Sequence, residues 1–217
     1  MLVIVGGGEV GSYHARQLRR AVLAGQVVGP VVVVDRSPDA PACAEFRGDP
    51  LVSVEVGEWS AFLAGWLREA DPTAHLVPAP FQPHLLWEWL GREIGAVGAT
   101  APSGWSLPYE VEDSSGARFL SAAAWRCPAT CVEPAHCPVL HAPRDWDLGD
   151  LLEDGARARG YEPAIFRCLH LAQGVGGIRV GAIQEARGRC ARSARPILVA
   201  TTSRCHAAIG ALARTVQ

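Results

Sequence analysis

Three glycines near the start of the chain have the spacing of a phosphate-binding turn. Gly6, Gly8 and Gly11 satisfy the pattern G-x-G-x-x-G directly after the apolar run 2–5 and before a helical pattern. In such a turn the first glycine permits the tight bend, the second lets a diphosphate approach the backbone, and the third lets helix and strand pack closely. The spacing therefore predicts a binding site for the diphosphate of a dinucleotide.

The residues beside this turn bear on which dinucleotide it would bind. Glu9 and Val10 open the helical pattern, so their N–H groups would face the phosphates at the positive end of a helix dipole. Asp35 follows the apolar run 31–34 and would accept hydrogen bonds from ribose hydroxyls, which favours NAD. Its neighbour Arg36 could accommodate a 2′-phosphate, which keeps NADP open. The alternative is a turn kept only for packing, in a protein that binds no dinucleotide.

A segment rich in cysteine and proline offers a second kind of chemistry. Cys127, Cys131 and Cys137 follow the spacing C-x3-C-x5-C, with a proline after the first and the third. Proline keeps a backbone out of regular structure, which suits a loop wrapped around a metal. Three thiolates could hold three corners of a 4Fe–4S cluster or three positions of a tetrahedral zinc site. We predict a metal centre here, with iron–sulfur favoured over zinc.

The fourth ligand of such a metal must come from a neighbouring histidine or from elsewhere in the chain. Cys168, in a strand-like stretch, is the predicted fourth ligand. Other residues with suitable donor atoms stay open: His136, His141, His170, Cys205 and His206. Two interpretations need no metal, namely thiols that are merely buried like small apolar groups and a redox pair that closes a transient disulfide.

The end of the chain carries a second thiol next to a histidine. The pattern predicts a strand over 197–201 and a last helix over 204–215, with Ser203 as its N-cap. Cys205 would then lie in the first helical turn, where the helix dipole favours the thiolate. Because the carboxyl ends of parallel strands line one crevice, Cys205 and His206 would face the glycine turn. These two are the predicted catalytic residues.

The elements that would position these residues alternate between strand and helix, which is the signature of a parallel sheet. Strands are expected at 2–5, 31–34, 52–56, 75–77 (ended by Pro78-Ala79-Pro80), 164–171 and 197–201. Helices are expected at 9–24, 60–69, 83–93, after the glycine-rich 174–177 and at 204–215, with a hairpin around 113–116. We therefore predict an α/β fold with a doubly wound, mostly parallel sheet, a Cys/Pro-rich loop insertion and a C-terminal βαβα portion.

The predicted organisation has two parts. Residues 1–100 form the dinucleotide-binding half. Residues 101–217 hold the Cys-rich loop, 125–147, and an α/β portion that packs on the same sheet.

The start of the chain also resembles known proteins. Residues 3–18 read Val-Ile-Val-Gly-Gly-Gly-Glu-Val-Gly-Ser-Tyr-His-Ala-Arg-Gln-Leu. This stretch resembles the NAD(P)-binding Rossmann superfamily, especially the nucleotide-binding domains of potassium-uptake regulators and the N-terminal domain of siroheme-type dehydrogenases. The resemblance covers about the first 95 residues and implies a Rossmann-like, NAD(P)-binding half, whereas the sequence after residue 100 fits neither pattern.

Composition excludes several classes of function. The chain has no lysine, so Schiff-base and P-loop lysine chemistry are excluded. A net charge of −2 gives no strong attraction to nucleic acid or to an anionic membrane. No apolar run reaches the 18 or so residues of a membrane span, and the N-terminus lacks the features of a signal peptide. We expect a cytoplasmic protein that binds neither nucleic acid nor membrane.

Together these features predict an NAD(P)-linked redox protein, an oxidoreductase with a Cys-ligated metal centre. One alternative is a non-enzymatic regulatory protein that responds to nucleotide or metal. Another is a zinc-stapled protein that binds a different adenosine-containing cofactor. The expected partners are a small-molecule substrate or a redox partner, with a homodimer as the assembly considered.

Overall fold

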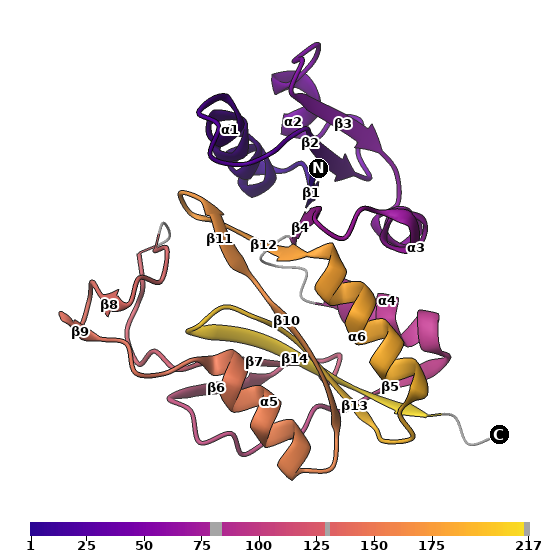
Figure 1. The fold of residues 1–217 in the computed structure, drawn as a ribbon, viewed down its shortest axis with the longest axis vertical. Helices are drawn as coiled ribbons and strands as arrows, with labels where there is room; N and C mark the ends of the chain where they lie inside the picture. Colours follow the sequence, from indigo (N-terminus) through magenta and orange to yellow (C-terminus); the bar gives the residue numbers. More distant parts are fainter. Residues whose placement is uncertain (79–83, 129–130, 215–217) are drawn as a thin grey trace. The chain divides into compact units, whose positions relative to one another are not determined.

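The computed structural model describes residues 1–78, 84–128 and 131–214. The chain divides into two compact units (Figure 1). The first unit comprises residues 1–85 and 169–184, and the second comprises 86–168 and 185–217. The chain therefore begins in the first unit, passes into the second, returns to complete the first, and ends in the second.

The first unit contains one mixed six-stranded sheet in the order β11-β12-β4-β1-β2-β3. Four strands pair in parallel, and a hairpin joins them antiparallel to β4. The parallel strands are β1 (Leu2–Val5), β2 (Val31–Asp35), β3 (Val52–Val56) and β4 (His75–Val77), and the hairpin is β11 (Leu169–Ala172) and β12 (Val175–Arg179). The continuous apolar runs of β1 and β2 suit strands that are buried on both faces.

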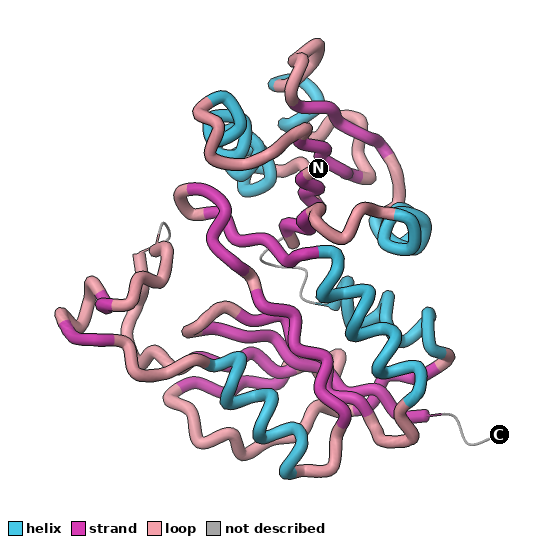
Figure 2. The backbone as a smooth tube through the Cα atoms, in the orientation of Figure 1, coloured by secondary structure: helices cyan, strands magenta, loops and turns pink. Residues whose placement is uncertain are grey.

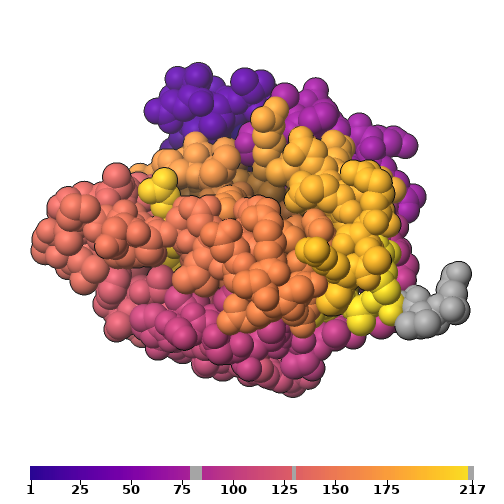
Figure 3. All heavy atoms as spheres, turned by 60° about the horizontal axis from the view of Figure 1, so that its bottom comes forward, coloured from indigo at the N-terminus to yellow at the C-terminus, as the bar shows by residue number. Residues whose placement is uncertain are grey.

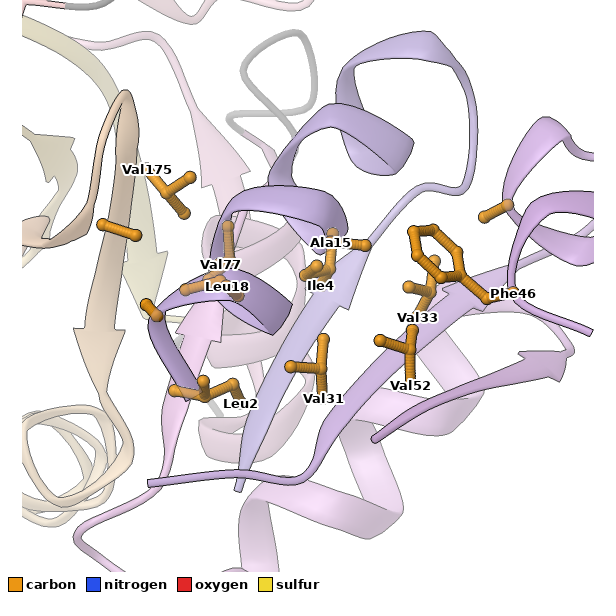
Figure 4. Packing of buried hydrophobic residues seen from close by; sticks show 13 residues of the cluster. Leu2, Ile4, Ala15, Leu18, Val31, Val33, Phe46, Val52, Val77 and Val175 are labelled. Carbon is orange, nitrogen blue, oxygen red and sulfur yellow. The ribbon is translucent and has the colours of Figure 1, made fainter. Parts of the chain in front are cut away.

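The core of the first unit lies between this sheet and helix α1 (Glu9–Leu23). Ala15 and Leu18 lie on one face of α1 and are fully buried, as the helical period of three to four residues requires. They pack in one cluster with Ile4 and Val33 of the sheet and with Val175 of the returning hairpin (Figure 4). Burying a leucine such as Leu18 contributes about 2 kcal/mol. Two further helices belong to this part of the chain, α2 (Pro41–Glu45) and α3 (Trp59–Glu69).

The second unit contains a different mixed sheet, in the order β10-β13-β14-β7-β6, with β5 also paired to β14. Only β10 and β13 are parallel neighbours, and the other pairs are antiparallel. Its strands are β5 (Ala96–Ala99), β6 (Tyr109–Glu112), β7 (Arg118–Ser121), β10 (Glu162–Arg167), β13 (Ile197–Thr202) and β14 (His206–Arg214). A separate two-stranded ladder is formed by β8 (His136–Cys137) and β9 (Ala142–Pro143).

Helix α5 (Leu148–Ala158) covers part of this second sheet. Asp147 caps its first turn, because the carboxylate accepts hydrogen bonds from the N–H groups of Gly149 and Asp150. Leu148 and Leu152, one turn apart, are fully buried and belong to a cluster with residues of β7, β13 and β14. The remaining helices, α4 (His84–Ile94) and α6 (Val180–Arg192), each contain a boundary between the two units.

The predicted doubly wound, mostly parallel sheet with a C-terminal βαβα portion is wrong. The chain forms two separate mixed sheets instead of one. The decisive element is the segment 206–214, predicted as a helix, which is strand β14. Its alanines and leucine favour helix, but β13 and β7 bond it along both edges, and such pairing overrides a weak propensity. Gly210 also lets the strand lie against the Trp87 ring, since a Cβ there would stand 2.6 Å from the ring.

Most of the other predicted elements are confirmed within two or three residues. These are β1 to β4, α1, α3, α4, the hairpin of β6 and β7, α6 and β13. The strand predicted at 164–171 is two strands, β10 and β11, which belong to different sheets. The predicted ends of three elements lie outside the described residues, namely Ala79, Pro80, residue 83 and residue 215. Residues 129 and 130 also lie outside them.

Within the residues that the structure describes, no helix is both long enough and apolar enough to cross a membrane.

The carboxylate of Asp49 connects α1 to the start of β3. It accepts hydrogen bonds from the N–H groups of Leu51 (2.9 Å) and Val52 (3.1 Å) and from Arg19 Nε (2.6 Å). These contacts, first the backbone bond from Leu51, hold the pKa of Asp49 below its ordinary value of 3.8, against a smaller effect of burial. A lowered folded-state pKa stabilises the fold above the unfolded value, and this contribution is lost as pH falls through the folded value.

We therefore predict that Asp49→Asn lowers the free energy of unfolding at neutral pH and flattens its decline below about pH 4. Urea unfolding measured from about pH 6 to about pH 2 checks this. Asp39→Asn, at an exposed position of the same unit, is the matched control and should follow the wild-type curve. An unchanged pH dependence in Asp49→Asn would contradict the role given to this carboxylate.

Candidate functional site

The glycine turn of the first unit joins β1 to α1 in a tight bend. Gly6 has a φ of +97°, in the region that favours glycine, and its N–H donates to the carbonyl of Val34 at 2.8 Å. A Cβ on Gly11 would stand 1.8 Å from the carbonyl oxygen of Gly6. The first and third glycines of the motif therefore have the predicted roles of bending the chain and letting helix and turn touch.

The N-terminus of α1 is open to a ligand. Gly8 is the N-cap residue in an extended conformation, and no described side chain caps this end of the helix. Gly8, Glu9 and Val10 are all exposed. A Cβ on Gly8 would meet nothing within 4 Å, so the space over the turn is clear. The first N–H groups of α1 and the positive end of its dipole thus face an accessible position.

Asp35, at the end of β2, is bound to this turn. Its Oδ2 accepts a hydrogen bond from the N–H of Gly7 at 2.6 Å, and its Oδ1 accepts one from Ser37 at 2.8 Å. The carboxylate therefore holds the glycine turn in place. It also lies at the position where the sequence predicts binding of the ribose. Arg36 lies with its guanidinium 4.5 Å from the centroid of the Trp59 ring, a cation–π contact that directs it to the start of α3. The structure brings together six predicted residues of this site: Gly6, Gly8, Glu9, Val10, Gly11 and Asp35. Arg36 follows Asp35, but its guanidinium lies on Trp59.

The second candidate site lies in the Cys segment, residues 125–147, of the second unit. Outside β8 and β9 the described part of this segment has no regular strand or helix (Figure 2). Glu133 anchors it to the turn between β13 and β14. Its Oε1 accepts from Ser203 Oγ (2.7 Å) and from the N–H of Cys205 (3.3 Å), and its Oε2 accepts from the N–H of Arg204 (2.6 Å). In Figure 3, yellow atoms from the C-terminal part of the chain lie against this salmon-coloured segment.

Glu133 is held in an uncommon backbone conformation. Its φ is +49°, in the left-handed region that costs a residue with a side chain about 1 kcal/mol. The three hydrogen bonds of its carboxylate offset this cost. Its own N–H donates to Cys131 Sγ at 3.4 Å, so one residue contacts a thiol of the segment and the backbone of Cys205.

The thiols of this region differ in their surroundings. The pKa of the Cys137 thiol is lowered, first by a hydrogen bond from the N–H of Leu140 and then by one from Val139. Burial raises the pKa of the Cys127 thiol, and the neighbouring thiols of Cys131 and Cys137 raise it further. Three thiols of the segment therefore lie within electrostatic reach of one another.

Cys205 is buried in the turn between β13 and β14. Its sulfur accepts a hydrogen bond from Trp146 Nε1 at 3.4 Å, and the guanidinium of Arg144 also bonds to it. Burial nevertheless raises the pKa of this thiol. The predicted position of Cys205 in the first turn of a helix is wrong, because the residues that follow it form strand β14.

Arg144 connects these thiols. Its guanidinium lies 5.6 Å from the centroid of the Trp146 ring. Burial lowers its pKa, but the Cys205 thiol, the Glu133 carboxylate and the Cys137 thiol raise it on balance. Arg144 is thus a partly buried positive charge that interacts with two thiols and a carboxylate.

The structure does not bring all the predicted ligands and catalytic residues into one site. Cys168 follows β10, and burial raises the pKa of its thiol to about 12. His206 opens β14 and is exposed. Among the described residues, no three His, Cys, Asp or Glu side chains are placed to hold a metal ion. His206 belongs to the second sheet and Cys205 to the turn before it, whereas the glycine turn belongs to the first sheet. These residues therefore do not lie along the edge of one sheet, as the prediction of a single crevice required.

Sequence reasoning missed Glu133 and Arg144. Glu133 contacts residues about 70 positions later in the chain, and no local pattern indicates such a pairing. One signal was present: Glu133 is the only carboxylate between Cys127 and Cys137. A single acidic residue among three closely spaced thiols is a signal that this residue belongs to the site.

Comparison with known proteins gives one match. A family model, AF_1314_C, described as the C-terminal domain of an uncharacterised protein, matches residues 83–215. This match covers more than half of the chain and includes the Cys segment. No curated protein and no solved structure matches the chain.

The contact between Gly11 and Gly6 predicts a large effect of one methyl group. Gly11→Ala should destabilise the first unit by about 3 kcal/mol, because the new Cβ would overlap the carbonyl oxygen of Gly6. Gly65→Ala, in α3 with open space around it, should leave the stability unchanged or raise it slightly. Urea unfolding of both variants checks this, and equal stabilities would contradict the close contact.

The anchor at Glu133 predicts an effect on the Cys segment. Glu133→Gln should lower the free energy of unfolding by about 2 kcal/mol, because an amide nitrogen would face one of three hydrogen-bond donors. Faster cleavage by trypsin after the exposed Arg126 should accompany this loss. Asp154→Asn, on the exposed face of α5, is the matched control. Wild-type proteolysis in Glu133→Gln would show that the anchor does not order the segment.

Proposed function

The chain belongs to the AF_1314_C family, and we propose that it binds NAD or NADP through the glycine turn of its first unit and serves in redox chemistry. The observation that carries the proposal is the uncapped N-terminus of α1 over a clear space. A diphosphate there would accept hydrogen bonds from the first N–H groups of the helix and interact with the positive end of its dipole. The dipole alone contributes about 1 kcal/mol to the binding of an anion.

The arrangement of Asp35 supports a dinucleotide over a free phosphate. Each carboxylate oxygen of Asp35 accepts one backbone hydrogen bond, from Gly7 or from Ser37. A carboxylate oxygen can accept two, so both oxygens keep a position for a ribose hydroxyl. The carboxylate is already fixed by the turn that would hold the diphosphate, so phosphate and sugar would be bound by connected groups.

Arg36 bears on the choice between NAD and NADP. Its guanidinium is stacked on Trp59 and exposed, and Arg36 directly follows Asp35 in the chain. A guanidinium in this position suits the 2′-phosphate of NADP, whereas Asp35 disfavours it by charge. We propose that the site accepts both dinucleotides, and a direct comparison of NADH and NADPH affinities tests this.

The redox part of the proposal draws on the thiols of the second unit. An oxidoreductase would consume bound NADH when offered an electron acceptor, whereas a regulatory protein would bind NADH without turnover. Anaerobic incubation of the full chain with NADH and an artificial acceptor distinguishes the two. A protein that binds NADH tightly and never oxidises it would favour the regulatory function.

We predict that Gly8→Ala weakens NADH binding by about tenfold or more, because a methyl group would occupy the path of the diphosphate. The variant should fold as well as the wild type, since its Cβ meets no protein atom within 4 Å. Fluorescence titration gives the dissociation constant, and thermal unfolding confirms the fold. Gly65→Ala is the matched control, with wild-type affinity expected.

Two outcomes would overturn the proposal. One is the absence of binding of both NADH and NADPH to the full chain. The other is an affinity that Gly8→Ala does not change.

A further inference from the structure

The guanidinium of Arg36 contacts an aromatic ring and leaves its N–H donors unused. Its central carbon lies 4.5 Å from the centroid of the Trp59 ring. Arg36 is exposed, and among the residues that the structure describes it has no ion pair and no hydrogen-bond acceptor for its side chain. Arg16 and Arg19 of the same unit each pair with a carboxylate. A guanidinium stacks through its face and donates through its edge, so the donors of Arg36 remain available to an anion.

The backbone of the first unit sets the position of the Trp59 ring. Strands β2 and β3 are parallel neighbours, with Asp35 opposite Val56 at their carboxyl ends. The N–H of Gly57 donates to the carbonyl of Asp35 at 2.8 Å and so ties the turn after β3 to the end of β2. Trp59 then opens helix α3. The ring that Arg36 contacts is therefore carried by a turn that is hydrogen-bonded to the residue before Arg36.

Stacking on a ring prepares an arginine to bind an anion. A free arginine side chain samples many rotamers, and ordering it on binding costs affinity. The Trp59 ring restricts that freedom before a ligand arrives. Trp59 is itself half-buried, so the fold limits the movement of the ring. The contact therefore lowers the entropic cost of binding an anion at Arg36.

The neighbouring carboxylate indicates which anion this would be. Asp35 accepts a hydrogen bond from the N–H of Gly7 at 2.6 Å, and in the proposed dinucleotide site it would hold the adenosine ribose. A phosphate on the 2′ position of that ribose would be repelled by the carboxylate. A cation must offset this repulsion, and a guanidinium can bind phosphate through two parallel hydrogen bonds. Arg36 directly follows Asp35 and carries such a cation.

Resting on the proposed function of the glycine turn, we propose that Trp59 is the positioning residue through which the site accepts NADP(H) as well as NAD(H). The 2′-phosphate binds the edge of the Arg36 guanidinium, while the face of the guanidinium stays on the ring. Trp59 acts through Arg36 and touches no part of the ligand itself. A contact that served only to stabilise the start of α3 would leave the relative affinity for the two dinucleotides unchanged.

The test is calorimetric titration of the full chain with NADPH and with NADH. Heat is measured because the loss of a tryptophan changes the fluorescence of the protein. The readout is the NADPH dissociation constant divided by the NADH dissociation constant. Arg36→Ala should raise this ratio by about tenfold or more, since charge-assisted hydrogen bonds to the phosphate are lost. Trp59→Leu should raise it by about threefold to tenfold, through the loss of the cation–π contact and of the ordering of Arg36.

Two further variants separate positioning from structure. Trp59→Phe keeps an aromatic face and should have a ratio closer to that of the wild type than Trp59→Leu has. The double variant with Arg36→Ala and Trp59→Leu should have the ratio of Arg36→Ala alone, because Trp59 acts only through Arg36.

Trp66→Leu is the matched control. Trp66 is another half-buried tryptophan of α3, and it stacks on Phe62 with ring centroids 5.9 Å apart. Its substitution should leave the ratio at the wild-type value. Both dinucleotides are titrated on the same preparation of each variant, so an unfolded fraction removes sites for both equally and does not alter the ratio.

Three results would overturn the role of Trp59 while NADH binding, and with it the proposed function, stands. These are a wild-type ratio in Trp59→Leu, a double variant whose ratio exceeds that of Arg36→Ala, and a wild-type chain that binds NADH but not NADPH. A wild-type chain that binds neither dinucleotide overturns the proposed function and this inference with it. The two failures are therefore distinguishable in one set of titrations.

Discussion

The pairing of β14 with three other strands is the constraint on which most of the second unit depends. β13 and β7 bond its two edges, and β5 continues the pairing beyond β7. The short turn from β13 into β14 places Cys205 at the end of the sheet and presents the backbone N–H groups of Arg204 and Cys205 to the Glu133 carboxylate. The described part of the Cys segment has little regular structure of its own. The hydrogen bonds between Glu133 and this turn therefore hold the segment in place.

Both candidate sites use a carboxylate to fix a turn of the backbone. Asp35 accepts the N–H of Gly7 and so shapes the glycine turn in the first unit. Glu133 accepts the N–H groups of Arg204 and Cys205 and so fixes the thiol-bearing turn in the second. A charged acceptor bonds backbone N–H groups more strongly than a neutral one does. In each candidate site, a carboxylate therefore holds the turn in place by accepting hydrogen bonds from its backbone N–H groups.

The sequence predicted local elements well and their assembly badly. The apolar runs of β1 and β2 end at glycine or aspartate and are strands as expected. The segment of β14 is rich in alanine, and only pairing with distant strands makes it extended. The glycine turn could be predicted because its glycines act on one another across a few residues. The link from Glu133 to Cys205 depends on a sheet that local patterns do not indicate.

The returning hairpin β11–β12 has a consequence for how the protein is made. β12 covers the edge of β4, and Ala172 and Val175 complete the core around α1. On the ribosome, the N-terminal strands emerge long before these residues exist, so the edge of β4 stays unpaired while most of the second unit is translated. A fragment cut at residue 85 would lack β12, so the edge of β4 would keep its unpaired N–H and C=O groups as a template for pairing with another chain.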